Sequence, residues 1–246
     1  MTLASVLALG FVLGMRHASD ADHVVAVSTI VARTKRLGAA WLLGAFWGAG
    51  HSLTILLVGA AIILFKVSIP PRVGLAMEFA VGLVLIALGL LNLLGGRLWK
   101  SHRHGHGHGA AAGHSHLHVH WLRPAWLRRS LETAGRGRLL RSLAVGLTHG
   151  LAGSAAIALL VLATIPTPAL GLIYLAVFGA GTLAGMLLLG AAMEVPMVLA
   201  ARRSAAAARG LVLASGALSL CFGLYIAYHI GFADGLFLAV PHWTPQ

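Results

Sequence analysis

Charge and sulfur are both scarce in this chain. Only 10% of its 246 residues are charged and 59% are hydrophobic, which argues against a soluble protein and for a membrane protein. Cys221 is the only cysteine, so an intrachain disulfide and a sulfur-rich metal site are excluded. The pattern G-x-x-x-x-G-K followed by Ser or Thr is absent, and binding of ATP through a P-loop is therefore excluded as well.

Long hydrophobic runs account for most of the chain. A helix crosses the hydrocarbon core of a bilayer in about 20 residues, and six runs reach that length. They lack the alternation of barrel strands, so the sequence predicts an all-α, polytopic membrane protein. The six expected transmembrane helices cover roughly residues 3–31, 40–65, 74–95, 141–164, 170–199 and 209–232.

Positive charge is unevenly distributed between the two sides of this expected bundle. The formal net charge is +12, and Lys and Arg gather after the first, third and fifth runs. The loops on the opposite side contain only Lys66 and Arg72. Because basic loops stay in the cytoplasm, the asymmetry predicts a protein of the cell (inner) membrane with both termini extracytoplasmic. Membrane orientation explains the charge pattern, and no nucleic acid partner is expected.

The parts of the chain that flank residues 97–140 resemble each other. "GMRH" (14–17) matches "GLTH" (146–149), and "GAGHSLTILLVGAA" (48–61) matches "GAGTLAGMLLLGAA" (179–192). Gly82 and "GLL" (89–91) match Gly216 and "GLY" (223–225) at nearly the same offset. These matches predict two three-helix repeats, 1–96 and 141–246, separated by the loop 97–140. An odd number of spans per repeat inverts the second repeat relative to the first, as in many transporters.

The stretch "GMRHASDADHVVAV" (14–27) concentrates charge inside the first apolar run. His23 lies about 15 Å from Arg33 along a helix, which places it near the middle of the bilayer. An ionisable group at that depth is costly unless it is paired or hydrated, so a function is expected. Arg16 and Asp20 are four residues apart and can pair on one helical face.

The other polar residues of this stretch, His17, Asp22 and His23, are a ligand set suited to a divalent transition metal. His17 and Asp22 point about 140° apart on an ideal helix, so the helix must distort near residues 18–22 or other helices must complete the site. His51 in "GAGHSLT" lies at a similar depth and is expected to face this stretch. His149 in "GLTHGLAGSA" is nearer the cytoplasmic end and is either a further ligand or a hydrogen-bonded core residue.

The residues "RHASDADH" (16–23) fit the pattern H-x-x-x-x-D-H through His17, Asp22 and His23. Together with "HVVAVSTIVART" (23–34) and "WGAGHSLTILLVG" (47–59), they make the chain similar to the nickel/cobalt transporter (NiCoT) family, especially its short urease-accessory (UreH-like) members. The resemblance implies a role in metal recognition and uptake for these three residues, for Asp20 within the same motif and for His51. The acidic, threonine-rich motif of larger members is replaced here by "GLTHGLAGSA" (146–155).

A histidine-rich tract, "HRHGHGHGAAAGHSHLHVH", occupies residues 102–120 of the central loop. Exposed imidazoles bind divalent ions near pH 7, so the tract is interpreted as a cytoplasmic metal buffer or sensor. A solvated linker is the alternative interpretation. The histidines of the tract are His102, His104, His106, His108, His114, His116, His118 and His120.

The sequence predicts a transporter that takes up Ni²⁺, with Co²⁺ as the second candidate and no cofactor beyond the transported ion. Two alternatives stay open: an exporter of the same metals with a metal-sensing loop, and an intramembrane serine hydrolase that uses Ser154 and His149. These two residues lie five apart on one helix, which is poor geometry for a catalytic pair, so the chain is not expected to be an enzyme. Expected partners are the lipid bilayer, the metal ion, and a cytoplasmic metallochaperone or the maturation proteins of urease or hydrogenase.

Overall fold

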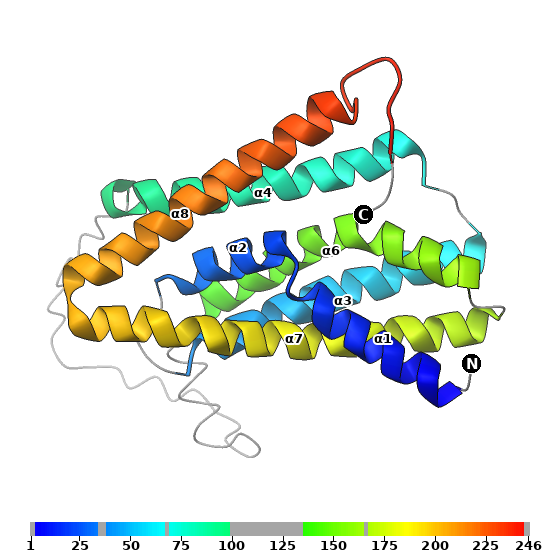
Figure 1. Ribbon diagram of the computed structural model, residues 1–246, viewed down its shortest axis with the longest axis horizontal. Coiled ribbons are helices and arrows are strands. Elements are labelled where there is room, and N and C mark those ends of the chain that lie inside the picture. The colour runs from blue at the N-terminus through cyan, green and yellow to red at the C-terminus, as the bar shows by residue number, and fades with distance from the viewer. Residues whose placement is uncertain (1–2, 34–37, 67–68, 99–134, 165–166, 244–246) are drawn as a thin grey trace, which may run out of the picture.

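A computed structural model describes residues 3–33, 38–66, 69–98, 135–164 and 167–243, without the side chains of 95–98 and 153–164. Helices make up the regular structure of these ranges, which confirms the all-α prediction (Figure 1). In chain order they are α1 (Leu3–His17), α2 (Ala21–Val31), α3 (Ala40–Phe65), α4 (Pro71–Leu98), α6 (Arg136–Thr164), α7 (Pro168–Arg203), α8 (Ala205–Tyr228) and the π-helical turn η1 (His229–Ala233).

Four stretches of the described residues are long and apolar enough to cross a membrane, as expected for an integral membrane protein. They are Ala40–Phe65, Pro71–Leu94, Pro168–Arg203 and Ala205–Ala233. The first apolar run differs from a single long helix, because it is divided into the two shorter helices α1 and α2.

The break between α1 and α2 falls at residues 18–20. Short-range bonds close the end of α1: Ser19 N donates to Arg16 O at 2.9 Å, and Asp20 N donates to His17 O at 3.1 Å. The extended backbone of Asp20 (φ −61°, ψ 150°) then redirects the chain into α2. Because local bonds satisfy these backbone groups, the break is tolerated at membrane depth. The distortion expected near residues 18–22 is confirmed.

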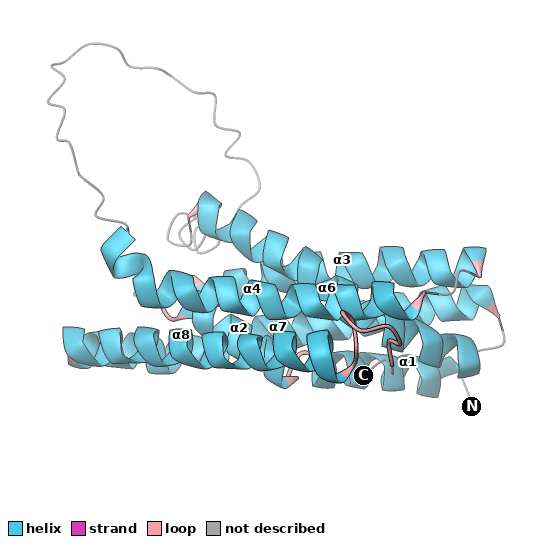
Figure 2. Ribbon diagram, turned by 90° about the horizontal axis from the view of Figure 1, so that it is seen from above, coloured by secondary structure: helices cyan, strands magenta, loops and turns pink. Residues whose placement is uncertain are grey.

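The helices form a bundle in which α3 packs against α6 and α7, α4 packs along α8, and α1 packs along α7. Figures 1 and 2 show α2 in the interior, where it contacts α3, α4, α7 and α8. Side-chain bonds fix its far end, since Asn92 Nδ2 donates to Thr29 O at 2.8 Å and Arg33 Nε donates to Asn92 Oδ1 at 3.0 Å. In Figure 1, α2, α4 and α7 end at the left, where α3, α6 and α8 begin.

Glycines at matching positions of the two halves bring helix backbones into matching contacts. A Cβ on Gly14 would collide with the carbonyl of Phe178, and a Cβ on Gly146 would collide with the carbonyl of Trp47. Small residues of this kind allow helices to approach closely in lipid. Further contacts related by the same sequence offsets are Gly50–Leu143 and Gly181–Phe11, Gly59–Leu175 and Gly190–Gly44, and Gly82–Gly223 and Gly216–Gly89.

Substitution of Gly146 tests whether this close packing stabilises the bundle. Gly146→Ala is expected to reduce stability by about 1–3 kcal/mol, because the new Cβ forces α3 and α6 apart. Gly210→Ala is the matched control, since a Cβ on Gly210 meets nothing within 4 Å. The thermal unfolding midpoints of the two variants in detergent measure the difference. Equal midpoints would show that the glycine contacts do not stabilise the fold.

Candidate metal centre

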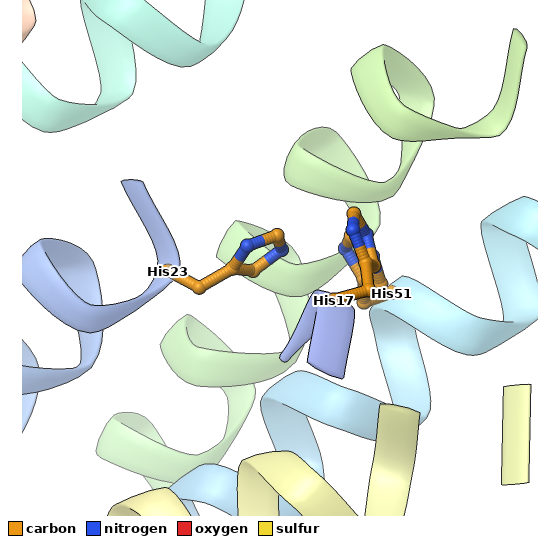
Figure 3. Close-up of side chains that lie close together, drawn as sticks. All are labelled: His17, His23 and His51. Atoms are coloured by element: carbon orange, nitrogen blue, oxygen red, sulfur yellow. The ribbon is translucent and has the colours of Figure 1, made fainter. Parts of the chain in front are cut away.

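The break in the first run places several polar side chains next to one another. His17 is the last residue of α1, while Asp22 and His23 lie in the first turn of α2. His51 reaches the same place from the middle of α3, and His149 reaches it from α6. Figure 3 shows the ring of His23 pointing from α2 toward His17 and His51. The structure therefore brings these five predicted residues into one cluster.

His23 occupies the centre of this cluster. Its ring centroid lies 4.7 Å from that of His17, 4.9 Å from that of His51 and 4.7 Å from that of His149. The candidate ligand atoms form two groups. Within each group all ligand atoms lie within 4.8 Å of one another, and both groups contain His23. One consists of His17, His23 and His51, and the other consists of Asp22, His23 and His149.

Distances between neighbouring ligand atoms suit a bound transition metal. Metal–nitrogen bonds of about 2.0–2.1 Å separate neighbouring ligand atoms by about 3.0–3.4 Å. His17 Nε2 lies 3.1 Å from His51 Nε2, and His149 Nε2 lies 2.8 Å from Asp22 Oδ2. Only small movements would be needed for these atoms to hold an ion between them.

The imidazoles are deeply buried, and several of their nitrogen atoms lack partners. The exposed fractions of His23, His51 and His149 are 2%, 0% and 1%. The Nε2 atom of His23 and the Nδ1 atoms of His51 and His149 have no hydrogen-bond partner among the described residues, whereas His23 Nδ1 lies 3.1 Å from Asp22 Oδ1. An unpaired buried polar group costs about 1–3 kcal/mol. A divalent ion bound by imidazole nitrogens would compensate this cost, so the donor set fits a metal.

The carboxylates hold the imidazoles in place. His17 Nδ1 donates to Asp20 Oδ2 at 2.7 Å, which leaves the lone pair of a neutral imidazole on Nε2, facing His51. Asp22 Oδ2 accepts from His149 Nε2, and Asp22 Oδ1 accepts from the backbone N of His23 at 2.9 Å. Asp20 thus supports a ligand, whereas Asp22 is within reach of an ion itself.

The expected pairing of Arg16 with Asp20 is wrong. The carboxylate of Asp20 contacts His17, and no ion pair joins it to Arg16 among the described residues. The break ends the helical spacing on which the expectation relied, because Asp20 lies beyond the last residue of α1.

A cavity of about 510 Å³ extends from the cluster to residues of α4, α8 and η1. Beyond the cluster it is lined by Glu78 of α4, Tyr225 of α8 and His229 of η1. The carboxylate of Glu78 accepts a hydrogen bond from Trp243 Nε1 at 2.8 Å. Sequence reasoning did not assign these residues to the site. An acidic residue near the start of an apolar run was the available signal for Glu78.

Two aromatic rings flank the cluster. The ring of Trp47 lies 5.4 Å from that of His149, and the ring of Phe178 lies 5.6 Å from that of His17. Both aromatic side chains are buried. Sequence reasoning missed them as well, because an aromatic residue in an apolar run usually indicates only a packed core.

Other predicted residues are not placed at the centre. The histidines of the tract 102–120 lie outside the described residues. The side chain of Ser154, the expected partner of His149 in the alternative hydrolase, is also outside the described residues. The ring of His149 is hydrogen-bonded to Asp22.

Comparison with known proteins identifies the family. The urease accessory protein UreH of Bacillus sp. (strain TB-90) is 39% identical over 235 residues, which cover 96% of each chain. This chain belongs to the UreH-like group of the NiCoT family. The resemblance carried by "RHASDADH" is thereby confirmed, and membership agrees with a protein that is not itself an enzyme. No family model matches the chain, and no solved structure does.

Removal of the Asp20 carboxylate tests its support of His17. Asp20→Ala is expected to weaken the binding of Ni²⁺, used as a probe metal, to the purified protein about 10- to 100-fold, because the His17 ring loses its orienting acceptor. His242→Ala is the control, since His242 is exposed and lies outside the cavity that reaches the cluster. Equal Ni²⁺ affinities of the two purified variants would contradict a supporting role for Asp20.

Proposed function

We propose that this chain is a multi-pass membrane transporter that takes Ni²⁺ into the cell, with Co²⁺ as a second substrate. The observation that carries this proposal is the cluster of buried imidazoles, several with a ring nitrogen that lacks a partner among the described residues, beside a carboxylate at the break between α1 and α2. Such a cluster is expensive inside a membrane protein unless an ion uses it. The urease accessory role in the name of the relative favours nickel, the metal of urease.

The transporter is proposed to consist of two inverted three-helix repeats, 1–96 and 141–246, with six spans in total. The matched glycine contacts of the two halves support this arrangement. So does the meeting of His17 and His149 at one centre, because they hold equivalent positions in "GMRH" and "GLTH". An inverted repeat brings equivalent residues together near the membrane midplane.

We place both termini outside and the loop 97–140 in the cytoplasm. The basic residues between consecutive spans support this orientation, since they cluster where α2, α4 and α7 end. The histidine tract 102–120 would then receive ions on the cytoplasmic side and act as a buffer. A metallochaperone or urease maturation proteins are the proposed acceptors.

Access to the cluster is proposed to come from the extracytoplasmic side. The cavity that leads to Glu78 and His229 supports this direction. Toward the opposite end, the buried side chains of Trp47, Leu43 and Leu139 fill the space. Release into the cytoplasm would therefore require these side chains to separate.

Nickel uptake into proteoliposomes tests the proposed site. His17→Ala, Asp22→Asn and His51→Ala are each expected to reduce uptake at least about tenfold, because each removes a metal-facing group. His242→Ala is the control, since His242 is exposed and lies outside the cavity. Uptake that stays unchanged in all three variants would overturn the proposal.

Cells loaded with nickel test the direction of transport. Deletion of the gene is expected to lower cellular nickel, because an importer supplies it. A rise in cellular nickel after deletion would instead indicate an exporter.

A further inference from the structure

We propose that the cluster forms two stations that one ion occupies in turn, with His23 shared between them. The three-histidine station consists of His17, His23 and His51, and the carboxylate station consists of Asp22, His23 and His149. This inference rests on the proposed transport function and specifies how the ion crosses the centre of the protein.

Sharing of His23 makes the two stations mutually exclusive. A neutral imidazole has one nitrogen with a free lone pair, so it binds one ion at a time. A second ion in the neighbouring station would lose this ligand and would be repelled by the first. The cluster therefore holds a single ion, although it contains ligands for two positions.

His23 is also the residue best able to change partners. Asp20 holds Nδ1 of His17 at 2.7 Å, and Asp22 holds Nε2 of His149 at 2.8 Å. His23 Nδ1 has only a longer contact of 3.1 Å with Asp22 Oδ1, and its Nε2 has no hydrogen-bond partner among the described residues. The Asp22 carboxylate favours the proton on Nδ1, which leaves the lone pair on the unpartnered Nε2 to bind an ion. Its ring centroid lies 4.7 Å from those of both His17 and His149, so it stands midway between the stations.

The surroundings of the two stations correspond across the two halves of the chain. His17 lies beside Phe178, and the equivalent His149 lies beside Trp47, which is equivalent to Phe178 in the aligned segments. Transfer moves the ion from the Phe178 side to the Trp47 side. In this step the bonds to His17 and His51 break, and bonds to His149 and Asp22 form.

Charge favours transfer in this order. The three-histidine station has only neutral ligands, whereas the carboxylate station adds the Asp22 anion. The cavity reaches both stations, since His17 and Asp22 both line it, with side chains 17% and 29% exposed. The order of transfer therefore rests on the charge of Asp22, which holds the ion after it leaves the neutral ligands.

Nickel binding to the purified full-length chain tests the two stations. All eight histidines of the tract 102–120 are first replaced by serine, so that only the cluster binds. Stoichiometry is measured by equilibrium dialysis, and the ligands are identified by X-ray absorption at the nickel edge. His51→Ala, His149→Ala and His23→Ala are compared with the control His242→Ala.

One nickel per chain is expected in the parent protein and in the control. His51→Ala should still bind one ion, with two imidazoles and a carboxylate, and His149→Ala should still bind one, with three imidazoles and no carboxylate. Neither variant should transport, because each lacks one station. His23→Ala should bind none.

Different results distinguish the two proposals. Two nickel ions in the parent protein, or the same coordination in both single variants, would overturn the shared stations. Nickel uptake by the parent protein would in that case still support the proposed transport function. Loss of binding in both His51→Ala and His149→Ala would indicate one joint site and would overturn them too. A parent protein that neither binds nor transports nickel would overturn the proposed function itself.

Discussion

The break between α1 and α2 is the constraint on which the rest of the structure depends. Backbone polar groups inside a membrane must find partners within the protein, and ionisable side chains there must be paired. Residues 18–20 meet the first requirement with local hydrogen bonds. The second is met only in part, by the imidazole–carboxylate contacts of His17 with Asp20 and of His149 with Asp22, because several buried ring nitrogens keep no partner among the described residues. A continuous helix would have pointed His17 and Asp22 in different directions.

Close helix packing follows from the same constraint. His51 and His149 reach the break only because α3, α6 and α7 approach one another through glycines. Gly146 lies against the backbone of Trp47, and Gly150 lies against that of His51, so the helices that carry two ligands are held together beside the cluster. Packing and ligand placement are therefore parts of one arrangement, and the matched contacts of the two halves extend it to the whole bundle.

Much of this could be predicted from the sequence, because composition and span length restrict a chain so strongly in a membrane. The all-α fold, the distortion near residues 18–22 and the candidate ligands all followed from the depth and spacing of polar residues. The partner of Asp20 did not, since the 3.6-residue period ends where the helix breaks. Trp47 and Phe178 were also missed, because their role depends on contacts between segments far apart in the chain. The central position of His23 among three imidazoles could not be predicted either, because it also depends on contacts between segments far apart in the chain.

The most direct test of the account is the position of nickel in crystals of the nickel-loaded protein, located by its anomalous scattering. The account predicts a peak within bonding distance of the His23 ring, between α2, α3 and α6. It also predicts that this peak disappears in His23→Ala while the helices remain in place. A nickel peak only at the protein surface or in the histidine tract, with the cluster unchanged, would contradict it.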